Sequence, residues 1–281
     1  MAAHPDDRSP SVPTAVTLRR LDEIAWTPVQ RQRNADGSES EIRERWPIIR
    51  PGCLSAWVHY GPGMVVRRHG HRSNHVVVVL EGSGHLGDEP CGPGTHVHVP
   101  LGATFGPIVA GPEGLVCWEV SFGEFGGWGD EPERFAAAVA EHGVTPLPDP
   151  PIDLGDWFVD PRNDWGGERP SPRIPGLAEV STQPADLPER ESAPGVRSRR
   201  AIDSPNFRSE TLELAPGADV GLPAATAHRL LLVVDGSVTL DGVTAVAPAH
   251  LEVPQGCSTG ILQAGADGAK VLLLADGPLG A

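Results

Sequence analysis

The stretch PGMVVRRHGHRSNHVVVVLEGS, residues 62–83, recurs in outline as PGADVGLPAATAHRLLLVVDGS, residues 216–237. Both open with Pro-Gly, carry an apolar run and close with Gly-Ser, at a constant offset of 154 residues. The same offset aligns GTHVHVPLG (94–102) with PAHLEVPQG (248–256). Because a repeat at fixed register indicates repeated structural units, the chain is predicted to contain two copies of one domain.

Short apolar runs between glycine and proline turns characterise both copies. The 281 residues include 34 Gly and 30 Pro, and runs such as LSAWVHY (54–60) and LVCWEVSF (115–122) are typical of strands. One helix is predicted over residues 130–143, where Asp130 can cap the first turn, Pro132 suits it and Gly143 can end it. The predicted fold class is therefore all-β with one short helix.

Charge and cysteine content restrict the partners and the compartment. The net charge is −15, from 37 acidic and 22 basic residues, and such a field repels phosphate backbones and anionic membranes. We therefore expect no nucleic-acid or membrane partner. The four cysteines form no C-x-x-C pair, and the N-terminal MAAHPDDRSPSVPT lacks the apolar segment of a secretory signal. A cytoplasmic location is expected.

Three histidines fall within the seven residues HGHRSNH, 69–75. On a strand, His69 and His71 leave the same face with Cα atoms roughly 7 Å apart, so both can reach an ion at about 2.0–2.1 Å. His75 shares their parity, but along a straight strand it would lie roughly 20 Å from His69. We therefore expect the chain to reverse at Arg72–Asn74, so that His69, His71 and His75 form one metal site.

The spacing of these residues resembles the motifs of the cupin superfamily. The first cupin motif reads Gly, five residues, His-x-His, three or four residues, Glu, six residues, Gly, and it aligns with Gly63, His69, His71, His75 and Gly82. Gly94, Pro100 and Gly102 align with the second motif. The resemblance covers roughly residues 50–125 well and 205–275 more weakly. It implies a bicupin, a chain with two small jelly-roll-like β-barrels.

Two departures from the family pattern stand at the site. His75 replaces the glutamate of the first motif, and Phe105 replaces the metal-binding histidine of the second. Three His ligands would remain, and the resemblance implies one divalent ion, for which we expect Fe(II) ahead of Zn, Ni or Cu, since imidazole suits all four metals. A site without metal, with Phe105 filling the space of the lost ligand, is the alternative.

The resemblance, together with changes in composition and in the pattern of apolar runs along the chain, predicts four parts. Residues 1–15 are a disordered N-terminus, 16–125 a metal-binding cupin barrel, 126–196 the helix with a Pro-rich connector, and 197–281 a degenerate cupin barrel. The last part is expected to be structural, because Pro223, Ala225 and Arg229 occupy the positions of the three histidines. The two barrels are expected to pair within a monomer or in a homodimer.

Candidate catalytic residues lie on neighbouring strands. Glu119, between apolar residues, is expected to have a raised pKa and to act as a base, with a surface glutamate at the end of a strand as the alternative. His59 is a candidate acid, base or fourth ligand, with a core histidine as the alternative. Arg67 shares parity with His69 and is a candidate clamp for an anionic substrate, with a salt bridge at the rim as the alternative. Arg68 and Arg72 are expected to be solvated.

Three more residues are expected to shape the substrate pocket. Trp57 shares a strand face with His59, His98 belongs to the run HVHVP, and Phe105 stands beside the histidines in the motif alignment. Tyr60 has the opposite parity to Trp57 and is not included.

Three functions are open at this point. The first is a non-heme Fe(II) dioxygenase acting on a small enolic or aromatic metabolite of specialised bacterial metabolism. The second is a redox-neutral cyclase or isomerase in which Zn or Ni polarises a carbonyl. The third is a non-catalytic bicupin that binds a small molecule.

Overall fold

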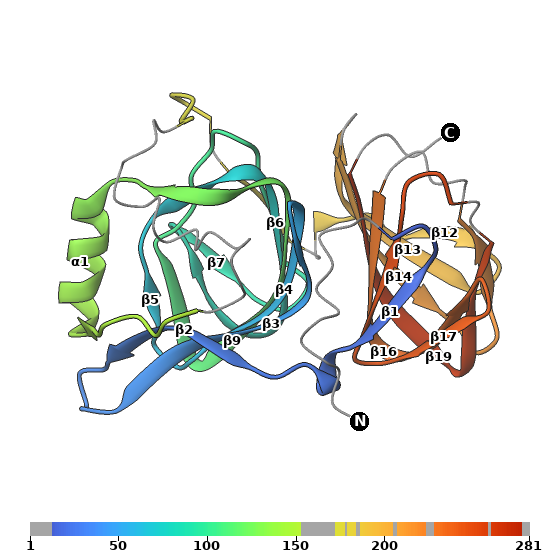
Figure 1. Cartoon of the computed structure of the whole chain (residues 1–281), viewed down its shortest axis with the longest axis horizontal. Helices are drawn as coiled ribbons and strands as arrows, with labels where there is room; N and C mark the ends of the chain where they lie inside the picture. The colour runs from blue at the N-terminus through green and yellow to red at the C-terminus, as the bar shows by residue number, and fades with distance from the viewer. Residues whose placement is uncertain are drawn as a thin grey trace. The chain divides into compact units, whose positions relative to one another are not determined.

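The computed structural model divides the chain into two compact units (Figure 1). Residues Ala25–Ser181 form one unit, called the N-terminal barrel, and Met1–Ile24 with Thr182–Ala281 form the other, called the C-terminal barrel. The structure describes residues 13–152, 172–177, 179–183, 186–204, 207–222, 228–257 and 260–276. The predicted disorder of residues 1–12 and the part of the predicted connector over 153–171 lie outside the described residues.

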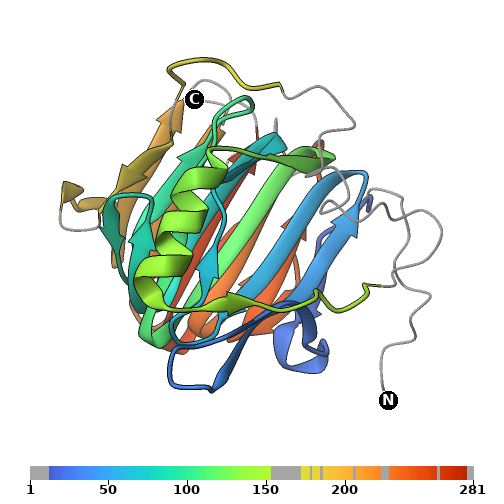
Figure 2. The same ribbon diagram turned by 90° about the vertical axis from the view of Figure 1, so that its left-hand side faces the viewer.

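The N-terminal barrel is built on an antiparallel sheet of ten described strands that curls round on itself (Figures 1 and 2). They are β2 (Thr27–Arg33), β3 (Glu39–Arg50), β4 (Gly52–Tyr60), β5 (Val65–Val66), β6 (His69–Leu86), β7 (Glu89–Cys91), β8 (His96–Val99), β9 (Ile108–Gly129), β10 (Thr145–Pro146) and β11 (Val180–Thr182). The main path of the sheet runs β10-β2-β3-β4-β9-β6-β8-β11, with β5 on β9 and β7 on β6. The two longest strands, β6 and β9, pair in its centre.

The C-terminal barrel is built on a second antiparallel sheet, of nine described strands. They are β1 (Thr17–Arg20), β12 (Arg190–Ala193), β13 (Val196–Ser204), β14 (Phe207–Leu214), β15 (Asp219–Gly221), β16 (His228–Leu240), β17 (Val243–Val246), β18 (Ala249–Val253) and β19 (Ile261–Asp276). Strand β1 pairs with β18, and a short 3-10 helix, Leu21–Glu23, follows it. Residues 17–24 therefore pack with the C-terminal barrel, whereas the sequence placed them in the first one.

The offset of 154 residues recurs in the strand pairing. Val77 of β6 faces Glu119 of β9 in the N-terminal barrel, and Leu231 of β16 faces Leu273 of β19 in the C-terminal barrel. Each sheet encloses its own apolar cluster. The predicted class, all-β with two barrels and one short α-helix, is therefore confirmed for the described residues.

Strand alternation gives the N-terminal barrel an inner and an outer face. Val58 on β4, Cys117 on β9 and Val79 on β6 are direct partners, and all three belong to the apolar cluster inside the barrel. Trp57 and Trp118 are also direct partners, but they alternate with this set and face outward. The side chain of any residue on these strands can be assigned to a face from this register.

The helix α1 (Pro132–His142) lies against the strands of the N-terminal barrel (Figure 2). Pro132 occupies its first turn and Gly143, with φ of 62°, ends it, as predicted. The predicted cap is wrong, because Glu131 holds the N-cap position with no side-chain hydrogen bond. Asp130 instead accepts hydrogen bonds from Thr104 and Arg173. Among the described residues, no helix is long and apolar enough to cross a membrane.

Candidate metal centre

The three histidines lie on one continuous strand. β6 runs unbroken from His69 to Leu86, so the predicted reversal at Arg72–Asn74 is wrong. The strand bends instead, because His71 pairs with Gly127 and Ser73 with Gly123, which leaves two extra residues on β9. Gly123 and Gly126, with φ of 142° and 116°, adopt backbone conformations that other residues rarely reach. This bulge brings side chains together that a straight strand would hold apart.

Four rings form one cluster on the inner face of β6. The ring centroids of His69 and His71 are 5.0 Å apart, and those of His71 and His75 are 4.3 Å apart. Phe105 packs against all three, with centroid distances of 4.6, 5.9 and 5.3 Å to His69, His71 and His75. Phe105 is 1% exposed and exchanges two backbone hydrogen bonds with His69. The predicted ligand set and this predicted pocket residue are therefore neighbours.

The polar partners of the rings identify the nitrogen atoms that are available. Nδ1 of His69 donates a hydrogen bond of 2.8 Å to the carbonyl oxygen of Arg67, so its Nε2 carries the lone pair. Nε2 of His71 is buried and has no hydrogen-bond partner among the described residues, although part of the His71 side chain is exposed. Nε2 of His75 lies 3.3 Å from Oε2 of Glu119.

Burial keeps two of the imidazoles neutral. It lowers the pKa of His69 to about 4, against the opposing effect of the hydrogen bond to the Arg67 carbonyl. Burial, and then the proximity of His75 and His69, lowers the pKa of His71 well below its usual value. Both rings are neutral at pH 7, which is the state in which imidazole binds a metal ion.

Glu119 and Tyr60 complete the inner face beside the histidines. Glu119 of β9 faces Val77 of β6, two residues from His75, and its Oε1 accepts a short hydrogen bond from the hydroxyl of Tyr60. Burial raises the pKa of Glu119, but the approach of His75 and Tyr60 outweighs it and the pKa is lowered. The expected raised pKa of Glu119 is therefore wrong. Tyr60, which the sequence reading set aside, faces inward.

The cluster has the residue types and the ring spacing of a metal site, but the nitrogen atoms of its imidazoles do not converge on one point. Imidazoles bound to one ion at about 2.1 Å have ring centroids about 4.5–5 Å apart, close to the spacing seen here. In the described part of the chain, however, no group of three or more His, Cys, Asp or Glu side chains is placed to hold an ion as it stands. Side-chain rotation would have to turn the lone pairs toward a common point. The unpartnered Nε2 of His71 is the atom that such a rotation would satisfy.

Three predicted site residues face away from this cluster. His59 and Trp57 alternate with Val58 and Tyr60 on β4, so they lie on the outer face. Nδ1 of His59 lies 3.4 Å from the Arg43 guanidinium, and burial followed by that charge lowers the pKa of His59. His98 pairs with Val76 and also faces outward. Their predicted roles in the pocket are not supported, because alternation turns all three to the other side of the sheet.

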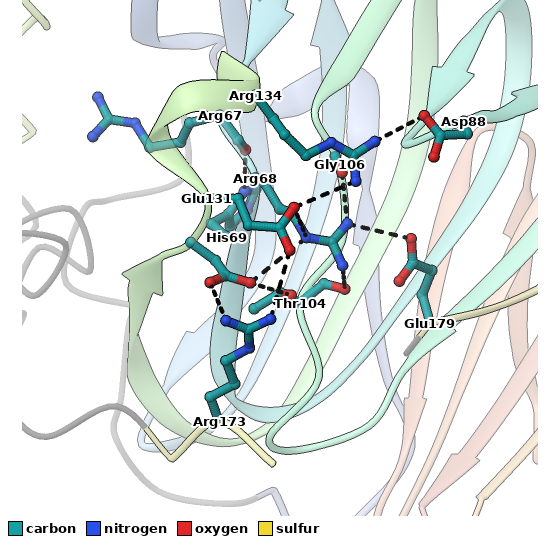
Figure 3. Close-up of polar contacts among 11 residues, drawn as sticks. Arg67, Arg68, His69, Asp88, Thr104, Gly106, Glu131, Arg134, Arg173 and Glu179 are labelled. Carbon is teal, nitrogen blue, oxygen red and sulfur yellow. Dashed lines mark hydrogen bonds and ion pairs between the residues drawn. The ribbon is translucent and has the colours of Figure 1, made fainter. Parts of the chain in front are cut away.

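Arg67 does not enter the barrel either. Its guanidinium carbon lies 5.6 Å from the ring centroid of Phe135 on α1, and Figure 3 shows the side chain pointing away from its neighbours. β5 ends at Val66, and residues 67 and 68 lie outside any strand, so the parity of His69 does not extend back to Arg67. A substrate clamp at this residue is not supported.

Arg68, expected to be solvated, lies instead in the middle of a buried ion-pair cluster (Figure 3). Its side chain is 11% exposed, and its Nη1 donates a 2.7 Å hydrogen bond to the carbonyl of Gly106. Asp130, Glu131 and Glu179 lie 3.6–3.7 Å from its guanidinium nitrogens. This cluster, called the Arg68 cluster, fixes the backbone that leads directly into His69.

The glycine between the first two histidines is required by close packing. A methyl group on Gly70 would lie 2.4 Å from Cζ2 of Trp128 and 2.5 Å from the carbonyl oxygen of Ala103. We expect Gly70→Ala to lower the free energy of unfolding by about 1–3 kcal/mol, as overpacked cores do. Denaturant unfolding followed by tryptophan fluorescence measures it. Gly92→Ala is the control, because the nearest atom to its added methyl group is 4.0 Å away; equal stability of the two variants would contradict the packing argument.

The C-terminal barrel lacks the same set of side chains. Pro223 and Ala225, opposite His69 and His71 in the repeat, lie outside the described residues. Arg229 stands at the position of His75 and is fully buried. Leu273 stands at the position of Glu119 and Leu214 at that of Tyr60, both within the apolar cluster. Its described inner face therefore offers leucines where the N-terminal barrel offers a carboxylate and a phenol.

Solved structures with the same architecture are known. A candidate dioxygenase from Nostoc punctiforme matches with a TM-score of 0.62 and 14% identity, covering 95% of this chain and 85% of that one. Oxalate decarboxylase from Bacillus subtilis matches with a TM-score of 0.60 and 17% identity, covering 95% and 78%. Both are cupin-fold proteins. The chain therefore has the cupin fold. No protein-family model matches the sequence, and no curated protein matches it, so these similarities establish the cupin fold alone.

Proposed function

We propose that the N-terminal barrel is a metal-dependent cupin enzyme whose ion is held by His69, His71 and His75. The observation that carries the proposal is the contact of three imidazoles, two of them neutral through burial, on the inner face of β6. One of the similar structures, oxalate decarboxylase, is described with Mn(II) centres, which supports a divalent ion in a site of this fold. The C-terminal barrel has a structural role in this proposal.

The proposed reaction is the oxygenation of a small enolic or aromatic metabolite, with Fe(II) as the ion. When bound, Fe(II) supplies Lewis acidity toward an enolate or catecholate and a redox-active centre for O₂. The similar structure assigned as a candidate dioxygenase supports this choice over a redox-neutral reaction. A small-molecule substrate and a cytoplasmic location belong to the same proposal.

The side chains of the chain itself would prepare the substrate. Phe105 and the valines of β6 and β8 give the cluster an apolar wall, which favours an aromatic or enolic ring over water. The carboxylate of Glu119 is the one acidic group that contacts the histidine cluster among the described residues, with the phenol of Tyr60 behind it.

The test begins with elemental analysis of protein purified without a chelator or a His-tag. We expect about one equivalent of iron per chain. The iron-loaded protein should then consume oxygen when enolic and catecholic compounds are added. If the protein holds zinc or nickel and its turnover does not depend on oxygen, the oxygenase proposal is wrong and the protein is a cyclase or isomerase. A chain that stays metal-free after reconstitution with each of these ions would refute it and leave a barrel that binds a small molecule without catalysis.

A further inference from the structure

Glu119 is a buried carboxylate with an unusual set of neighbours. Its side chain is 12% exposed, and burying a carboxylate is costly unless a cation or several hydrogen bonds compensate. The contacts described for it are the Tyr60 hydroxyl on Oε1 and Nε2 of His75 near Oε2. Neither is a permanent cation. The Glu119 carboxylate therefore lies where it can bind a cation on the inner face of the barrel.

The separation of His75 and Glu119 is that of two ligands of one ion. Nε2 and Oε2 lie 3.3 Å apart, longer than the about 2.7–2.9 Å of a charge-assisted hydrogen bond. Two donor atoms at about 2.1 Å from one ion are about 3.0 Å apart at a right angle and about 3.4 Å apart at the tetrahedral angle. The observed distance falls within that interval, and side-chain rotation would still have to turn the lone pairs toward the ion.

The internal repeat offers an independent comparison. Where the C-terminal barrel has Arg229 in place of His75, it also has Leu273 in place of Glu119 and Leu214 in place of Tyr60. A carboxylate and a phenol that served only the packing of the fold would have no reason to be absent together with the histidine. The three residues occur together in one copy and are replaced together in the other.

We propose that Glu119 is the fourth protein ligand of the metal ion and that Tyr60 positions its carboxylate. This inference rests on the proposed function, since it takes the three histidines as the other ligands. The carboxylate then comes from β9 rather than from the first histidine motif, where His75 stands. Three neutral imidazoles and one carboxylate leave a divalent ion with a net charge of about +1 and, when octahedral, two adjacent open positions.

The test compares metal binding by the full chain and by Glu119→Gln, which keeps the shape of the side chain and removes its charge. Zn(II) affinity is measured by competition with a chromophoric chelator, and the absorption spectrum of the Co(II)-loaded protein reports the coordination. We expect Glu119→Gln to weaken Zn(II) binding by about 100-fold or more, because loss of a group that merely orients a ligand already costs about 10–100-fold. Tyr60→Phe is expected to weaken it by about 10-fold and to shift the Co(II) spectrum without abolishing it. Glu113→Gln, an exposed carboxylate, is the matched control.

The outcomes separate the two proposals. Unchanged Zn(II) affinity and an unchanged Co(II) spectrum in Glu119→Gln, with binding lost in His71→Ala, would overturn the fourth ligand and leave the three-histidine site intact. Absence of binding by the unmodified chain would overturn both. Because Glu119→Gln could also act by unfolding the barrel, its denaturant midpoint is measured alongside, and a native midpoint with weakened binding supports the proposal.

Discussion

Replacing His71 with alanine is expected to remove the bound metal ion from the protein. The Nε2 atom of His71 is buried without a hydrogen-bond partner among the described residues, and its ring lies between those of His69 and His75. Loss of a residue that only orients a ligand lowers the metal affinity by about 10–100-fold, and loss of a ligand itself lowers it further. The metal content, measured after gel filtration, should fall from about one equivalent to almost none. His69→Ala should behave in the same way.

Two other histidines provide matched controls for this result. His59 and His98 stand on strands of the same sheet but face outward, so His59→Ala and His98→Ala should keep the full metal content. The comparison tests the assignment of faces as well as the ligands. Full metal content in His71→Ala, or its loss in His98→Ala, would contradict the site.

The repeat shows how the faces could have been assigned from the sequence. The residues of the second copy that correspond to Val58 and Tyr60 are Leu212 and Leu214, in the run TLEL, where leucines alternate with polar residues. That alternation places the inner face at Tyr60 rather than at His59, and the structure agrees. Trp57 and His59 do share one face of the strand, as expected, but it is the outer face of the barrel.

The bend of β6 could not be predicted in the same way. Its cause is a bulge on β9, where the three residues Glu124–Gly126 stand opposite the single residue Arg72, and β9 is more than 40 residues away in sequence. The spacing of the histidines in HGHRSNH, taken alone, therefore predicts a turn that the continuous strand does not contain. The ligand set was predicted by motif spacing alone, while its geometry depends on glycines in the partner strand.

The Arg68 cluster was missed for a related reason. Arg68 was expected to be solvated, as arginines mostly are. Its partners come from three separate places: the loop before β9 at Gly106, the residues just before α1, and the segment at Glu179. A cluster assembled from such distant segments leaves no pattern in any one of them.

Replacing Arg68 with alanine is expected to lower the free energy of unfolding of the N-terminal barrel by about 3–5 kcal/mol. The substitution removes the donor to the Gly106 carbonyl and leaves Glu131 and Glu179 without this cation, at a place where the Arg68 side chain is only 11% exposed. All seven tryptophans lie between residues 26 and 165, so tryptophan fluorescence during denaturant unfolding follows this barrel alone. The loss should persist at high salt, because buried pairs are screened much less than exposed ones.

Arg33→Ala is the control for this measurement, since Arg33 pairs with Glu39 in the same barrel but with about half of each side chain exposed. An exposed pair of that kind contributes about 0–1 kcal/mol. Arg68→Lys should fall between the two, because lysine keeps the charge but lacks the planar fork whose two Nη atoms donate to Gly106 and Thr104. If Arg68→Ala and Arg33→Ala unfold at the same denaturant concentration, the Arg68 cluster contributes no more than a surface pair. A large loss in Arg68→Ala would instead show that the Arg68 cluster contributes strongly to the stability of the N-terminal barrel.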